Sequence, residues 1–245
     1  YMFNYCTGIT SLDLKNFETK NVETTAGLFY SCNKLEKIDL SNFDFGKNRD
    51  ISNMFSGCQA LGTITFGNLN TNNVEYMDGL FDDCSLLRTV DLSKMDTRSV
   101  KNMSCMFQDC IQLEEINVRN FDTSNVEDMS RMFIGCTKLT SLDVSNFNTR
   151  KVKDMTKMFE YLKLTSLDVS KFDTSNVLYM SDMFAEMKSV ISLDVSKFDT
   201  SKVRNISAMF YSCNRVRQIE VSGFDTSNVE DFSHMFYGCL WISSL

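Results

Sequence analysis

The feature that most constrains the fold is a dipeptide, Met-Phe or Leu-Phe, that recurs along the whole chain at a nearly constant interval. The interval is 26 residues everywhere except between Phe159 and Phe184, where it is 25. The phenylalanines of this dipeptide are Phe3, Phe29, Phe55, Phe81, Phe107, Phe133, Phe159, Phe184, Phe210 and Phe236. A period of roughly 20–50 residues is typical of a solenoid in which every repeat forms one coil.

Each repeat opens with a short alternation of apolar and polar residues. In one clear unit, Leu142 and Val144 are apolar, while Ser141, Asp143 and Ser145 are polar. This period of two is typical of a half-buried strand. The same alternation recurs at Leu12/Leu14, Ile38/Leu40, Val90/Leu92, Ile116/Val118, Leu167/Val169, Leu193/Val195 and Ile219/Val221. Stacked coils would place these strands side by side in one parallel sheet.

The second half of each repeat has a different apolar spacing. Val152, Met155, Met158 and Phe159 follow an i, i+3, i+6, i+7 pattern, which predicts a short helical or 3₁₀ segment with one apolar face. A polar Phe-Asp-Thr-Ser-Asn turn, as at residues 121–125, connects the two halves. The sequence therefore predicts an α/β solenoid, a leucine-rich-repeat-like right-handed stack of about nine coils. No linker or change of composition interrupts residues 1–245, so we expect a single repeat array.

The repeat resembles that of a known family. Met132-Phe133-Ile-Gly-Cys136-Thr-Lys-Leu139 matches the BspA-like leucine-rich repeat type with the pattern LDLSNFDTSNV…MSxMFxGC. This resemblance implies a surface-exposed or secreted protein that adheres to host or matrix proteins, and it supplies no catalytic residues. The chain departs from the pattern at residues 45–48, and at Tyr161 and Leu162, where one residue and the cysteine are lost. We expect locally irregular coils at both places.

Composition excludes several other classes of protein. The net charge of −7 argues against binding to nucleic acid, because phosphate backbones are bound by excess Lys and Arg. No apolar run is long enough to insert into a membrane, and the segment shows no targeting signal. The extracellular or cell-surface location thus rests on the family resemblance alone.

Eight of the nine cysteines form a ladder, each three residues after a repeat Phe. They are Cys6, Cys32, Cys58, Cys84, Cys110, Cys136, Cys213 and Cys239. Disulfides between neighbouring coils are one interpretation, and a row of buried free thiols is the other. Leu162 and Met187 replace the cysteine in two coils, which favours buried thiols. Cys105 lies off the ladder, so we expect it to be exposed and reactive.

Two acidic ladders raise the question of Ca²⁺ binding. One comprises Asp13, Asp39, Asp91, Asp143, Asp168 and Asp194, and the other Asp44, Asp96, Asp122, Asp173, Asp199 and Asp225. Each coil offers only one carboxylate per ladder, which is few for a hard cation. We therefore expect a solvated row, with some like-charge repulsion, for the first ladder and turn capping for the second.

No constellation of residues predicts catalysis, a cofactor or a metal. The only histidine, His234, occupies a variable slot that holds Asn53 and Ala208 in other coils. A translational repeat is expected to build flat surfaces rather than pockets of unlike groups. The leading hypothesis is a non-enzymatic array that binds a protein along its extended surface. The alternative is a structural block that assembles by end-to-end or lateral stacking.

Variable side chains indicate where a partner would bind. The candidate edge comprises Arg98, Arg150, Lys151, Lys153, Leu178, Tyr179 and Arg204. The chain is also expected to be a segment of a longer array, with Trp241, Ile242 and Leu245 at an open strand edge that favours self-association.

Overall fold

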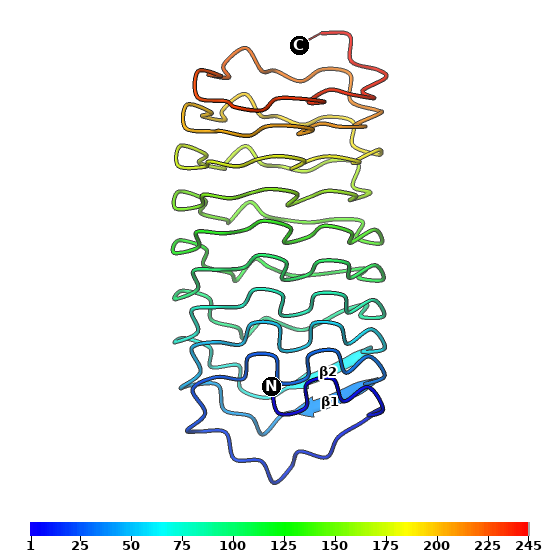
Figure 1. Cartoon of the computed structure of the whole chain (residues 1–245), viewed down its shortest axis with the longest axis vertical. Helices are drawn as coiled ribbons and strands as arrows, with labels where there is room; N and C mark the ends of the chain where they lie inside the picture. Colours follow the sequence, from blue (N-terminus) through cyan, green and yellow to red (C-terminus); the bar gives the residue numbers. More distant parts are fainter. Residues whose placement is uncertain (245) are drawn as a thin grey trace.

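A computed structural model describes residues 1–244, which wind into a stack of coils from one end of a rod to the other (Figure 1). Strands β1 (Lys37–Leu40) and β2 (Thr63–Phe66) belong to neighbouring coils and pair in parallel. Their register, Lys37 with Thr63 and Leu40 with Phe66, is a shift of one 26-residue repeat. One hydrophobic cluster runs through the coils, which confirms the repeat solenoid.

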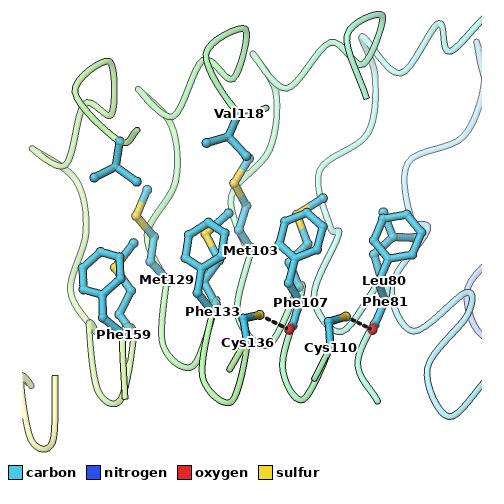
Figure 2. Packing of buried hydrophobic residues seen from close by; sticks show 14 of the residues in the cluster. Leu80, Phe81, Met103, Phe107, Cys110, Val118, Met129, Phe133, Cys136 and Phe159 are labelled. Carbon is cyan, nitrogen blue, oxygen red and sulfur yellow. Dashed lines mark hydrogen bonds between the residues drawn. The ribbon is translucent and has the colours of Figure 1, made fainter. Parts of the chain in front are cut away.

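The repeat phenylalanines form the centre of the core, as predicted (Figure 2). The Phe133 ring stacks on Phe107 with centroids 5.6 Å apart and on Phe159 with centroids 6.2 Å apart. Since every ring contacts the same residue of the next coil, each coil completes the burial of its neighbours.

The ladder cysteines lie beside these rings. Cys110 Sγ donates to the carbonyl oxygen of Phe81 and Cys136 Sγ to that of Phe107, both at 3.1 Å (Figure 2). All nine cysteines are free thiols in the structure, and the ladder members of the inner coils are buried. Leu162 and Met187 are fully buried at the equivalent slots, so they are apolar replacements, as expected.

The predicted helical segment is wrong, because residues 1–244 contain no helix. The backbone N–H groups of Met155, Lys157 and Phe159 instead donate to carbonyl oxygens of the next coil at 2.9–3.0 Å. The N–H of Met158, between them, closes a turn on the oxygen of Met155 at 3.2 Å. The backbone N–H groups of alternate residues therefore donate to the next coil and to their own coil. The successive turns point the apolar residues inward, which accounts for their spacing in the sequence.

Left-handed backbone conformations are the physical reason that no helix forms. Most coils hold two residues with positive φ, four positions apart, such as Lys157 at 59° and Tyr161 at 66°. Such residues do not propagate a right-handed helix. The first of the two positions holds Gly27, Asn53, Gly79, Cys105, Arg131, Lys157, Asp182, Ala208 and His234. Most of these are not glycine, so the sequence carries little sign of the conformation.

This geometry makes a testable prediction at Arg131, which is exposed and has a φ of 58°. Because glycine adopts this conformation without the steric cost of a Cβ, we expect Arg131→Gly to stabilise the fold by up to ~1 kcal/mol. Arg131→Val should instead destabilise it. Urea unfolding midpoints measure both, with Arg98→Gly as the control outside the left-handed positions. A gain for Arg98→Gly equal to that for Arg131→Gly would contradict this explanation.

The column of parallel backbone bridges that runs through the coils is not formed by the predicted strand segments. Single bridges join one residue of each coil, from Thr24 through Asp50, Tyr76, Asn102, Asp128, Asp154, Tyr179 and Asn205 to Asp231. The predicted strands pair as regular elements only in β1 and β2 among residues 1–244. In β1 and in other coils alike, a carboxylate accepts the amide just after the segment, as Asp143 Oδ1 accepts the N–H of Ser145 at 3.0 Å.

Candidate functional site

The predicted edge residues lie on one side of the coil stack, at its surface. Lys153, Leu178 and Arg204 lie at equivalent positions in three consecutive coils, where the Leu178 N–H donates to Lys153 O and the Arg204 N–H to Leu178 O, both at 2.8 Å. Tyr179 follows Leu178 on the bridge column and is exposed. Arg98, Arg150 and Lys151 are exposed in the turn that precedes this column. The structure thus brings the predicted residues to one edge, on a rigid backbone ladder.

Ion pairs neutralise part of this edge. Charges alternate along the column, so that Lys101 Nζ pairs with Glu75 and Lys153 Nζ with Glu127, both at 2.6 Å. The alternation is interrupted where Leu178 stands in place of the next acid, and Glu230 resumes it after Arg204. Between Glu127 and Glu230 the edge therefore combines cationic and apolar side chains.

The second acidic ladder caps turns, as expected. Asp122 Oδ1 accepts the N–H of Ser124 at 2.9 Å, and this arrangement recurs at Asp173 and Asp199. Hydrogen bonds from Ser124 hold the pKa of the Asp122 carboxyl below its usual range. Within residues 1–244 no group of three or more His, Cys, Asp or Glu side chains is placed to hold a metal ion.

The first acidic ladder is not simply a solvated, self-repelling row. Asp143 accepts the Ser145 amide and also pairs with Arg119 of the preceding coil at 2.7 Å. Hydrogen bonds from the hydroxyl and amide of Ser145, then from Arg119, lower the pKa of Asp143 to about 2. The same amide-to-carboxylate bond recurs at Asp39, Asp91, Asp168 and Asp194. These carboxylates stabilise the turn after the strand segment.

Cys105 does not fit the expectation of an exposed, reactive thiol. It is half-buried at a left-handed position with a φ of 55°. Burial, together with the charge of Asp82, raises the pKa of its thiol to about 11, although Arg131 opposes the shift. Since the thiolate is the reactive form, Cys105 is less reactive than an ordinary cysteine.

Asp82, which directly follows Phe81 of the Phe ladder, has a carboxyl with a strongly raised pKa. Its Oδ1 is buried without a hydrogen-bond partner, while Ser56 Oγ donates to Oδ2 at 3.2 Å. Burial is the main cause that raises its pKa to about 6, and the charges of Asp109 and Asp83 add to it.

A pH dependence follows from the raised pKa. The carboxyl binds its proton more tightly when folded, so its contribution to stability is complete below about pH 4 and lost as the pH rises through 6. We expect Asp82→Asn to gain stability relative to the natural chain between about pH 4.5 and 7.5, as measured by urea unfolding. Asp122→Asn, at a carboxyl with a lowered pKa, should be less stable than the natural chain by an amount that stays nearly constant over this range, because the stabilisation by the ionised carboxyl is lost only at lower pH. Identical pH trends for the two variants would contradict these assignments.

The surface of the later coils departs from the expected flat one. A hollow of about 600 Å³ opens there, lined by Glu160, Tyr161, Asp182, Ala185, Glu186, Ser207, Ala208, Tyr211, Ser233, His234 and Tyr237. It brings together acidic, aromatic and hydroxyl groups from four consecutive coils. His234, the only histidine, is exposed at its edge.

The hollow exists because two alanines stand where other coils have larger side chains. Ala185 lies at the slot of Gln108 and Tyr211, and Ala208 at the slot of Asn53 and Arg131. Tyr161, in the left-handed position that every coil has two residues after the repeat Phe, begins the shortened repeat beside the hollow. Comparing slots between coils reveals the two alanines in the sequence, but it does not show that their coils line one hollow.

The last coil holds the residues expected at an open edge. Trp241 is 59% exposed, and the Arg217 guanidinium lies 5.8 Å from its ring centroid. Ile242 is half-buried against the core, and the N–H of Ser243 donates to Arg217 O at 3.0 Å. Leu245 lies outside the described residues, and association through this edge stays a prediction.

A family model described as "Mycoplasma protein of unknown function, DUF285" matches residues 1–65, 62–165 and 135–244. No curated protein matches the chain. A leucine rich cell surface protein from Faecalibacterium prausnitzii A2-165 is 15% identical over 89% of this chain and 74% of its own, with a TM-score of 0.33. A leucine-rich repeat protein from Bacteroides ovatus ATCC 8483 is 16% identical over 89% and 78%, with a TM-score of 0.26.

Among the described residues, no helix has the length and apolar character to cross a membrane.

Proposed function

The chain belongs to the DUF285 family, and from this premise we propose that it is a non-enzymatic recognition array, displayed on a cell surface or secreted, that binds another protein along its extended edge. The matches together span nearly all of the chain and agree with the BspA-like resemblance of its repeat. Location and adhesion come from that resemblance.

The edge at Lys153, Leu178, Tyr179 and Arg204 is the observation that carries the proposal. Backbone bonds between coils hold these side chains in fixed order, while the side chains themselves are mostly exposed. Rigid presentation lowers the entropy that is lost when a partner binds. Exposed arginine and tyrosine are also among the residues that contribute most to protein interfaces.

The test compares two matched sets of charge removals. Beads that carry the array are applied to cultured animal cells and to a panel of immobilised extracellular-matrix proteins. We expect Arg150→Ser, Lys153→Ser and Arg204→Ser together to abolish binding. The control set, Lys171→Ser, Lys197→Ser and Lys94→Ser, removes the same charge from the exposed turns after the strand segments. Equal loss in both sets, or no binding to any surface in the panel, would overturn the proposal.

The alternative, a structural block, involves the apolar side chains of the last described coil. Phe232, Tyr237 and Trp241 are each more than half exposed there. Assembly by stacking would give sedimentation coefficients that rise with concentration, and charged substitution at Ile242 would reverse the rise. A recognition array stays monodisperse under the same conditions.

A further inference from the structure

The hollow in the later coils has aromatic walls around a small apolar base. Ala185 is buried at its bottom, and Tyr161 and Tyr237 stand at its rim with 47% and 60% exposure. Tyr211 and Tyr237 stack on each other with ring centroids 5.1 Å apart. The hollow therefore offers ring surface and phenol groups to a side chain that enters it.

Carboxylates supply the charge of the hollow. The Glu160, Asp182 and Glu186 side chains are only 7%, 26% and 16% exposed. Two lysines pair with them: Lys157 lies 2.9 Å from Glu160 and 3.6 Å from Asp182, and Lys188 lies 2.6 Å from Glu186. Three acids against two lysines leave one negative charge.

The Tyr161 phenol lies within the influence of these charges. Its pKa is raised first by the charge of Glu160, then by burial and by the charge of Glu186, while Lys157 and Lys188 oppose the shift.

We infer that the hollow is a docking site for an arginine side chain carried on a segment of a protein partner. An arginine guanidinium is planar, stacks on aromatic rings and forms paired hydrogen bonds with carboxylates, so it matches tyrosines next to partly buried acids. Lysine has the charge but not the planar shape, and an acidic segment would meet repulsion. The inference deepens the proposed function, on which it rests, by naming a chemical feature of the partner.

The four alanines of the chain allow a direct test with the natural protein. Ala185 and Ala208 line the hollow, whereas Ala26 and Ala60 lie in the first coils. With ¹³C-labelled alanine methyl groups, titration with acetylated, amidated hexaarginine should shift the Ala185 and Ala208 signals saturably. The Ala26 and Ala60 signals should stay in place, and hexalysine should bind more weakly. Equal shifts of all four methyl groups, or no saturable shift, would overturn the inference.

Two variants and a matched control separate the hollow from general electrostatics. Glu186→Gln should weaken hexaarginine binding about tenfold, because one charge-assisted bond is lost. Ala208→Asn fills the hollow with the side chain that Asn53 carries at the same left-handed slot, where φ is 54° at both positions, so the variant should fold and not bind. Glu127→Gln makes the same charge change on the edge and should leave binding unchanged. If Glu127→Gln weakens binding as much as Glu186→Gln, the inference fails.

The two proposals fail in distinguishable ways. The adhesion assay tests the edge with the whole array, whereas hexaarginine reports on the hollow whether or not any cell or matrix protein is bound. Loss of hexaarginine binding in the Arg150, Lys153 and Arg204 variant would place the peptide on the wrong surface and overturn the inference alone.

Discussion

Truncation of Phe133 to alanine is expected to destabilise the array by ~3–5 kcal/mol, the usual range for a large aromatic side chain removed from a core. The ring is fully buried and stacks on Phe107 and Phe159. The cavity would lie in the middle of the ladder, where neighbouring coils on both sides lose contact. Urea unfolding followed by circular dichroism measures the loss, and hydrogen exchange of amides in these coils shows where the array opens.

A surface aromatic residue provides the control for Phe133→Ala. Tyr76 is 42% exposed, and its column uses backbone bridges that an alanine also makes. We expect Tyr76→Ala to change stability by no more than ~0.5 kcal/mol. If the two variants unfold at the same urea concentration, the phenylalanine ladder is not the centre of the core.

The features that follow from stacking copies of one repeat along the solenoid axis could be predicted from the sequence. A residue that recurs every 26 positions must face the same way in every coil, so the burial of Phe133 and Cys136 follows from the period itself. The same reasoning identified Leu162 and Met187 as replacements for cysteine.

Backbone conformation could not be predicted in the same way. The spacing of Val152, Met155, Met158 and Phe159 fits one face of a helix, and it fits equally a chain of turns that points the same residues inward. The deciding feature is the left-handed conformation of residues such as Lys157, and neither a Gly nor an Asn marks it there. Because inter-coil hydrogen bonds stabilise that conformation, local sequence preference does not reveal it.

Of the two candidate surfaces, the edge could be predicted from the sequence and the hollow could not, for a related reason. Exposed charges such as Arg150 and Arg204 could be assigned to an edge because an edge repeats with the coils. The hollow depends on which residues happen to occupy variable slots, namely Ala185, Ala208 and Tyr161. Their proximity needs the register of four coils in three dimensions, including the shortened one.

The polar half of the fold should depend strongly on a buried threonine that recurs at the same position in most coils. Thr149 is 1% exposed, and its Oγ1 donates to the carbonyl oxygen of Asp173 at 2.9 Å while it accepts the N–H of Asp173 at 2.8 Å. Thr123 makes the same two bonds with Asn148, and Thr174 makes them with Asp199. One hydroxyl thus satisfies both backbone groups of a residue in the following coil.

Replacing that hydroxyl with a methyl group is expected to cost ~2–4 kcal/mol, because Thr149→Val keeps the shape but leaves a donor and an acceptor without partners. Thr149→Ser keeps the hydroxyl and should cost less than ~1 kcal/mol. Thr140→Val is the matched control, since Thr140 is exposed in the same repeat and its change should stay within ~0.5 kcal/mol. Urea unfolding ranks the three variants, and amide exchange at Asp173 should accelerate in Thr149→Val alone. If Thr149→Val and Thr140→Val unfold together, the coils are held by apolar stacking without help from the threonine ladder.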